Sequence, residues 1–324
     1  MLQETFLRLR KKFAIEDIYV STNADYVEEV ERELLELPKE NIIGEPEARG
    51  TASSFALTMA HIAAGNPQET IALFPADHLI KNPGPLIDEG LDHAQRYIKE
   101  HPDVIVTFGI VPDYPETGYG YIKRSTHHDH IGEDTIYTVE RFVEKPDAAT
   151  AQRYIEDGNY YWNTGMYMFR IDMVAEKFER FIPDTHKRMQ RIRDVVGTPE
   201  YEDVLTREYP LMDKINFEYA IVENDQNVVV MPLSIGWSDV GSWASLKDTL
   251  ISNTKDHFVR GEHVDFGSEN LLVYGSKKLI TTVGVKDLII VDTEDAILIC
   301  DRSKSQMISD VVKQLENSKN IKQL

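Results

Sequence analysis

The chain of 324 residues is poor in cysteine, in basic residues and in long apolar runs. Its one cysteine, Cys300, excludes an intrachain disulfide and a zinc site built from several thiolates. It has 35 lysines and arginines against 55 aspartates and glutamates, and this charge of −20 argues against nucleic acid as a partner. No run reaches the ~20 apolar residues of a membrane span, so we expect no membrane partner. The N-terminus lacks a signal-peptide pattern, which favours the cytoplasm.

The hydrophobic fraction of 42% is enough for a sizeable core. An amphipathic helix is predicted almost from the first residue, because Leu2, Phe6, Leu9 and Phe13 recur at helical spacing. Buried strands are expected at 18–20, 71–74 and 104–108, and helices at 25–36, 51–64 and 86–100. Apolar strands that alternate with helices predict an α/β fold with a mixed, mostly parallel sheet.

The middle of the chain is aromatic and changes character. Strands are expected at 119–124, 137–144 and 161–170, and helices at 148–157 and 172–181, as an insertion around a pocket. Beyond about Asp256 we expect a small β domain with strands at 271–274, 279–283, 288–291 and 296–300 and a terminal helix. We therefore predict a catalytic domain over residues 1–253 and a β domain over 254–324. A domain of this size cannot fully bury the apolar faces of its strands by itself, and contact with a second copy would bury them, which favours a homodimer.

Two aspartates follow strand-like runs. Asp77 comes directly after the run 71–74, where ligands of α/β sheets bind, and a carboxylate there could hold Mg²⁺ against a phosphate. A turn or a helix cap explains Asp77 equally well. Asp239 follows the run 228–231 and stands between two glycines, although a loop that caps the next helix is the simpler interpretation.

Further polar residues stand among aromatics. Glu144 and Lys145 adjoin at the predicted end of a strand, and both can face one pocket only if the strand ends or bulges there. Asn163 could bind a hydroxyl-rich ligand, or it could be satisfied by the backbone. The run 127–130 contains three histidines but is predicted to be a solvated hairpin loop rather than a metal site.

Taken in chain order, these motifs resemble the short mannose-1-phosphate guanylyltransferases of the sugar-nucleotide pyrophosphorylase family. The segments that carry the resemblance are 44–46, 50–52, 75–78, 108–112, 115–122, 142–146, 162–166 and 237–239. The resemblance implies a Rossmann-like nucleotidyltransferase fold. It also implies an Mg²⁺-dependent reaction of GTP with mannose 1-phosphate that gives GDP-mannose and pyrophosphate. Another hexose phosphate, or a non-catalytic subunit, remains the alternative.

The resemblance also implies a role for each candidate residue. Asp77 and Asp239 would hold Mg²⁺, and Lys145 would neutralise the sugar phosphate. Glu144 and Asn163 would bind mannose hydroxyls, with Gly120 allowing close approach of the backbone. The segment that would hold the base comprises Glu45, Gly50, Thr51 and Ala52. The carboxylate of Glu45 suits guanine, whose edge offers two donors.

The family opens with a strand and a glycine-rich loop of the form G-G-x-G-x-R-L-x-P, which the printed sequence does not contain. That opening amounts to about 30 residues, one supersecondary unit. Without it we expect loose packing near 18–20 and 71–74 and weak binding of GTP. The cupin-like domain of the long bacterial forms is likewise not expected within these 324 residues.

Overall fold

The computed structural model describes residues 1–251 and 256–317. It divides into two compact units, an N-terminal unit over Met1–Trp237 and a C-terminal unit over Ser238–Leu324. The short strand β10 (Trp237–Ser238) spans this division. The boundary predicted at 253/254 lies outside the described residues and stays a prediction.

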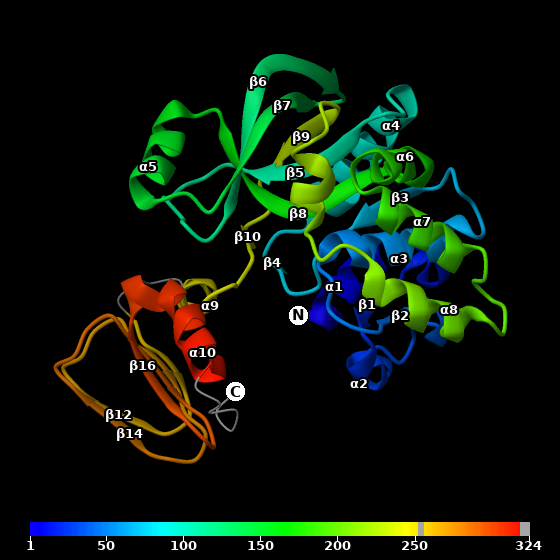
Figure 1. The fold of residues 1–324 in the computed structure, drawn as a ribbon. Helices are drawn as coiled ribbons and strands as arrows, with labels where there is room; N and C mark the ends of the chain where they lie inside the picture. The colour runs from blue at the N-terminus through cyan, green and yellow to red at the C-terminus, as the bar shows by residue number, and fades with distance from the viewer. Residues whose placement is uncertain (252–255, 318–324) are drawn as a thin grey trace. The chain divides into compact units, whose positions relative to one another are not determined.

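A six-stranded sheet in the order β3-β8-β5-β9-β7-β6 forms the centre of the N-terminal unit (Figure 1). Its members are β3 (Thr70–Leu73), β5 (Ile105–Ile110), β6 (Gly120–Ile131), β7 (Asp134–Glu144), β8 (Tyr160–Arg170) and β9 (Val228–Leu233). The sheet is mixed, as predicted, and its parallel neighbours are β5 and β9. The aromatic strands expected in an insertion belong to this sheet, because β8 pairs antiparallel with both β3 and β5. The alternation of strands and helices predicted a mostly parallel sheet, but parallel pairing is less common in this sheet than that prediction implied.

Smaller strands and the helices complete this unit. Strands β1 (Val20–Asn23) and β2 (Ile42–Glu45) form a separate parallel pair, and β4 (Leu79–Ile80) is a two-residue strand. The α-helices are α1 (Leu2–Leu9), α2 (Val27–Glu33), α3 (Thr51–Ala63), α4 (Leu91–Glu100), α5 (Ala148–Asp157), α6 (Ile171–Phe181), α7 (Pro183–Arg193) and α8 (Tyr201–Glu208). Two predicted helices begin irregularly, since α2 follows a 3₁₀ turn at Ala24–Tyr26 and α4 follows a π-helical turn at Pro85–Gly90. Helix α1 ends before Phe13.

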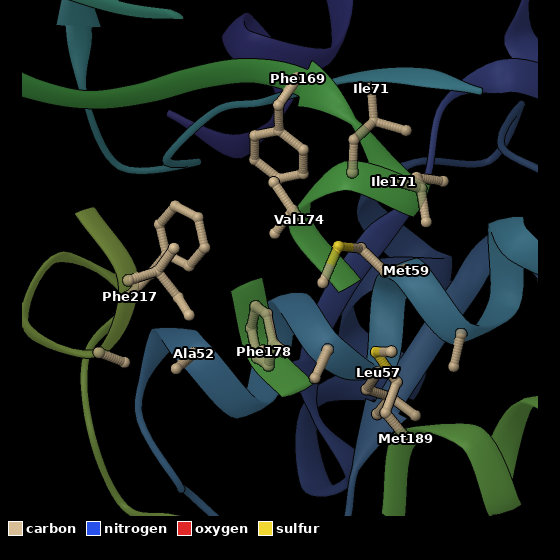
Figure 2. Close-up of a cluster of buried hydrophobic side chains, with 14 of the residues drawn as sticks. Ala52, Leu57, Met59, Ile71, Phe169, Ile171, Val174, Phe178, Met189 and Phe217 are labelled. Carbon is tan, nitrogen blue, oxygen red and sulfur yellow. The ribbon is translucent and has the colours of Figure 1, made fainter. Parts of the chain in front are cut away.

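The main core lies where α3, α6 and α7 pack beside β3 and β8 (Figure 2). Ala52 and Leu57 of α3 are fully buried there, as are Phe169 of β8 and Phe217. The ring of Phe217 lies 5.1 Å from that of Phe55 and 5.3 Å from that of Tyr167. The first turn of α3 and the segment at Phe217 are thus anchored against strand β8.

The C-terminal unit is a small β domain with a terminal helix, as predicted. Helix α9 (Trp243–Leu250) precedes a sheet in the order β11-β13-β15-β16 and a separate parallel pair, β12–β14. The strands are β11 (Phe258–Arg260), β12 (His263–Phe266), β13 (Leu272–Tyr274), β14 (Ile280–Val283), β15 (Leu288–Asp292) and β16 (Ile297–Asp301). Helix α10 (Ile308–Asn317) follows, but Val311 and Val312 of its apolar stripe are 49% and 39% exposed.

Among the helices of the described residues, none has the length and hydropathy that a membrane crossing requires.

Candidate functional site

Three of the predicted site residues meet on the central sheet. Gly120 of β6 is paired with Glu144 of β7, and β6 also pairs with β8, which carries Asn163. A Cβ atom at Gly120 would lie 2.6 Å from Oε2 of Glu144 and 3.5 Å from Cβ of Asn163. The absence of a side chain at Gly120 therefore leaves room for the carboxylate of Glu144 beside Asn163.

Strand β7 ends at Glu144, and Lys145 departs from extended geometry. Its φ of 45° lies in the left-handed region, which is rare for a residue other than glycine. Because the strand alternation is broken here, Nζ of Lys145 lies 3.3 Å from Oε1 of Glu144 although the residues are adjacent. The backbone N–H of Lys145 donates to the carbonyl of Tyr119, and its side chain is 64% exposed. The structure thus presents a cation beside the Glu144 carboxylate.

The amide of Asn163 is held at both ends. Its Oδ1 accepts a hydrogen bond from the N–H of Gly165 at 3.3 Å. The hydroxyl of Thr107 lies 3.4 Å from this oxygen and 3.1 Å from the carbonyl oxygen of Met166, and its one proton is shared between these two acceptors. Its Nδ2 donates to the hydroxyl of Tyr167 at 3.2 Å. An amide nitrogen carries two hydrogens, so one donor remains for a ligand.

Asp77 lies in the loop after β3, close to the Asn163 segment. A Cβ at Gly165 would lie 3.4 Å from Cγ of Pro75, which places the two loops in contact. Nδ1 of His78 accepts a hydrogen bond from Nε1 of Trp237 at 3.2 Å, so we assign the proton of a neutral His78 to Nε2. That nitrogen lies 3.8 Å from Oδ1 of Asp77, whose side chain is 83% exposed. Asp77 therefore offers an open carboxylate near the sugar-side residues.

Asp239 belongs to the C-terminal unit. The N–H of Gly241 donates to its Oδ1 at 2.8 Å, and a Cβ at Gly241 would lie 2.9 Å from its Oδ2. Val240 between them has a φ of 50°, a strained conformation for a β-branched residue. The local backbone thus fixes the carboxylate of Asp239 in a tight turn.

The donor chemistry of these two aspartates fits Mg²⁺, which prefers carboxylate oxygens and commonly completes its shell with substrate phosphates and water. Within residues 1–251 and 256–317, no group of three or more histidine, cysteine, aspartate or glutamate side chains could hold a metal ion by itself. The histidine run 127–130 lies within strand β6 rather than in the loop that the sequence predicted. Each of these carboxylates would therefore need further oxygen ligands, such as those of a substrate, to hold Mg²⁺.

The predicted base segment is anchored by its backbone. Gly50 has a φ of 81°, and a Cβ there would lie 2.7 Å from the carbonyl oxygen of Ile215. That same oxygen accepts the N–H of Ala52, and Thr51 Oγ1 accepts the N–H of Phe217 at 2.8 Å. The side chain of Ala52 is fully buried, so it faces the core and acts only through the backbone.

The carboxylate of Glu45 is largely occupied by hydroxyl groups. Its Oε1 accepts from Ser21 (2.9 Å) and Ser54 (2.7 Å), and its Oε2 accepts from Tyr209 (2.7 Å). Burial and this carboxylate together raise the pKa of the Tyr209 hydroxyl far above its ordinary value. A carboxylate has about four acceptor positions, and three of them are taken, so one position on Oε2 remains. A guanine edge offers two donors, so this carboxylate can accept only one of them in the arrangement described.

Two polar residues of the site were not predicted from the sequence. The hydroxyl of Tyr167 donates to Oε1 of Glu218 at 2.9 Å, and burial, with a contribution from Glu144, raises the pKa of the Glu218 carboxyl. Tyr167 lies four residues after Asn163 on the same strand and hence on the same face, a signal that the sequence did contain. Glu218 lies in a π-helical turn, Glu218–Val222, and had no comparable signal.

Comparisons with known proteins agree on one family. The family profile described as "Nucleotidyl transferase" matches residues 1–255, and that described as "MannoseP isomerase/GMP-like beta-helix domain" matches residues 261–315. The chain is 37% identical to "Mannose-1-phosphate guanylyltransferase ManC" of Salmonella typhimurium over 98% of the chain and 66% of that protein. It is 35% identical to "Mannose-1-phosphate guanylyltransferase" of Klebsiella pneumoniae over 98% of the chain and 67% of that protein.

A solved structure is similar along nearly the whole chain. It is the crystal structure of a protein described as a mannose-1-phosphate geranyltransferase from Thermus thermophilus. The TM-score is 0.80 and the identity 28%, over 97% of this chain and 89% of that one. By contrast, the chain spans only about two thirds of the length of the curated relatives it matches.

Proposed function

The chain belongs to the nucleotidyl transferase family, among the mannose-1-phosphate guanylyltransferases, and from this premise we propose that it makes GDP-mannose and pyrophosphate from GTP and mannose 1-phosphate. An oxygen of the sugar phosphate attacks the α-phosphorus of GTP, and the bond to pyrophosphate breaks. The observation that carries the proposal is the convergence of Gly120, Glu144, Lys145 and Asn163 on one sheet. This group combines acceptors and a donor for hydroxyls with a cation for a phosphate.

On this proposal, each side chain binds or orients rather than reacts. The ammonium of Lys145 neutralises the phosphate of the sugar, and it is exposed enough to meet a ligand. Glu144 accepts hydrogen bonds from sugar hydroxyls, and the free N–H of Asn163 donates one. Holding both substrates in one geometry accounts for much of the rate in reactions of this kind.

Asp77 and Asp239 are the residues that would hold a divalent cation, which we propose to be Mg²⁺. When bound, Mg²⁺ supplies positive charge that offsets the charge of the reacting phosphates. The support is the donor chemistry, namely two carboxylates, one 83% exposed and the other fixed by Gly241.

The nucleotide is proposed to lie against the segment that contains Glu45, Gly50, Thr51 and Ala52. Glu45 retains one acceptor position on Oε2, which suits one donor of guanine. A second hydrogen bond to the base would require Ser21 or Ser54 to release Oε1.

A direct assay tests the activity. Purified chain is incubated with GTP, Mg²⁺ and mannose 1-phosphate, and GDP-mannose is separated and quantified, with glucose 1-phosphate and UTP as alternative substrates. Preference for another sugar phosphate would favour a different hexose, and absence of product with any pair would favour a non-catalytic subunit.

Paired substitutions test the shared metal. Asp77→Asn and Asp239→Asn should each lower kcat at least 100-fold, and the double variant should be no worse than either alone, because both remove the same ion. Asp92→Asn, which affects a surface pair with Lys12, is the control. Multiplicative losses in the double variant would contradict a shared site.

We also propose a homodimer formed through the C-terminal unit. Phe266 and Val283, partners on the neighbouring strands β12 and β14, are 74% and 69% exposed. A Phe266→Glu, Val283→Glu variant should sediment as a monomer, and so should a chain that ends near residue 253. An unchanged oligomer would refute the assignment. Location in the cytoplasm stays a prediction from the sequence.

A further inference from the structure

We propose that Tyr167 and Glu218 are positioning residues that hold the Asn163 amide in its sugar-binding orientation. This inference rests on the proposed function, because it assumes that Asn163 binds the sugar. Neither residue is assigned a direct contact with a substrate.

The hydroxyl of Tyr167 has two defined partners. It accepts from Nδ2 of Asn163 at 3.2 Å and donates to Oε1 of Glu218 at 2.9 Å. The side chain of Tyr167 is fully buried, so bulk water has no access to replace either partner. Hydrogen bonds in such surroundings are stronger than in water, and an unmade one is costly.

The direction of this chain of hydrogen bonds fixes the amide. Because the carboxylate of Glu218 accepts, the Tyr167 proton points toward Glu218 and the oxygen lone pairs remain for Asn163. Nδ2 of Asn163 is thereby drawn to Tyr167 while its Oδ1 faces Gly165. A flipped amide would set Oδ1 against the oxygen of Tyr167, so the remaining N–H of Asn163 has one orientation.

Glu218 also adjoins a residue that contacts the predicted base segment. It follows directly after Phe217, whose N–H donates to Oγ1 of Thr51 at 2.8 Å. Burial raises the pKa of the Glu218 carboxyl, in keeping with a group held away from water. The adjacent residues Phe217 and Glu218 therefore contact the predicted base segment and the predicted sugar segment respectively.

The first experiment compares two Tyr→Phe variants in the full chain. Tyr167→Phe should raise the KM for mannose 1-phosphate about tenfold and leave the KM for GTP within about twofold. The reason is that the substitution removes the hydrogen bond that holds the Asn163 amide, which is assigned to the sugar. Tyr97→Phe is the matched control, since the hydroxyl of buried Tyr97 also donates to a carboxylate, that of Asp129, at 2.9 Å. The control should change neither constant. An unchanged KM in Tyr167→Phe would overturn the proposal.

A double-variant cycle separates positioning from general stability. In an Asn163→Ala background, Tyr167→Phe should raise the KM for the sugar phosphate by less than about twofold, because the residue through which it acts is gone. A full tenfold effect in that background would show that Tyr167 acts otherwise. Glu218→Ala should resemble Tyr167→Phe, and Glu218→Gln, which keeps an acceptor for the tyrosine, should restore most of the loss.

Calorimetric titration with mannose 1-phosphate distinguishes the two proposals. If the unaltered chain binds the sugar phosphate without forming GDP-mannose, and Tyr167→Phe weakens that binding about tenfold, the positioning role stands and the proposed function falls. If GDP-mannose forms and Tyr167→Phe binds mannose 1-phosphate as tightly as the unaltered chain, the proposed function stands and the positioning role falls. If the unaltered chain neither binds nor turns over mannose 1-phosphate, both fall.

Discussion

The backbone at Gly120 lies so close to the side chain of Glu144 that a Cβ atom there would stand 2.6 Å from Oε2. Gly120→Ala should therefore push the Glu144 carboxylate away from Asn163. The carboxylate is the far end of a flexible side chain, so we expect the fold to survive. The KM for mannose 1-phosphate should rise at least about tenfold, as expected when a hydrogen bond that involves a charged group is lost.

Gly65→Ala is the matched control, because the nearest atom to its new Cβ, the carbonyl oxygen of Ile62, would be 3.6 Å away. Thermal unfolding of both variants, measured beside their steady-state kinetics, separates folding from binding. Normal kinetics in Gly120→Ala would contradict a sugar-side role for Glu144.

Lys145 supplies the cation at the end of β7. Lys145→Ala should raise the KM for mannose 1-phosphate about tenfold or more and change the KM for GTP much less, because the ammonium is assigned to the sugar phosphate. Lys123→Ala, on the neighbouring strand β6, removes an ammonium paired with Glu140 and serves as the control. Equal effects of Lys145→Ala on both substrates would count against the assignment.

The pKa of Glu218 gives a prediction about stability and pH. Burial raises this pKa in the folded state above its unfolded value. The contribution of a raised carboxyl pKa to stability is fully present below the unfolded value, about 4.3, and is lost as the pH rises through the folded value. Glu218→Gln removes this titration, so the variant does not lose this stability as the pH rises. The melting temperature of the variant minus that of the unaltered chain should therefore increase from pH 4 to pH 7.

Thermal unfolding at several pH values between 4 and 8 checks this expectation. Exposed Glu176→Gln on helix α6 is the control and should show no such trend. An advantage of Glu218→Gln that is independent of pH would mean that Glu218 does not titrate as described.

The sequence predicted those parts of the site that local pattern controls. The end of strand β7 at Glu144 was predicted from residue types, and the pairing of β6 with β7 then brought Gly120 and Glu144 together. Glu218 could not be found this way, because it reaches Tyr167 only through the packing of Phe217 against β8. The antiparallel course of β8 also escaped prediction, since periodicity identifies a strand but not its direction.

The last prediction concerns the edges of β1 and β3. Within the described residues, β1 pairs with β2 and β3 pairs with β8, and the other edge of each strand has no ladder partner there. The resemblance implies an opening strand and a glycine-rich loop ahead of helix α1. Each buried backbone group without a partner costs about 1–3 kcal/mol, and a whole domain is stable by only about 5–15 kcal/mol.

A chimera that carries such a strand and glycine-rich loop ahead of Met1 should therefore unfold at a temperature several degrees higher than the 324-residue chain. It should also bind GTP at least about tenfold more tightly, because backbone N–H groups of a glycine-rich loop can cradle phosphates. The measurement compares the two purified forms by thermal unfolding, GTP titration and GDP-mannose synthesis. Cooperative unfolding and full activity of the 324-residue chain would overturn the argument, because another segment would then have to supply the phosphate site.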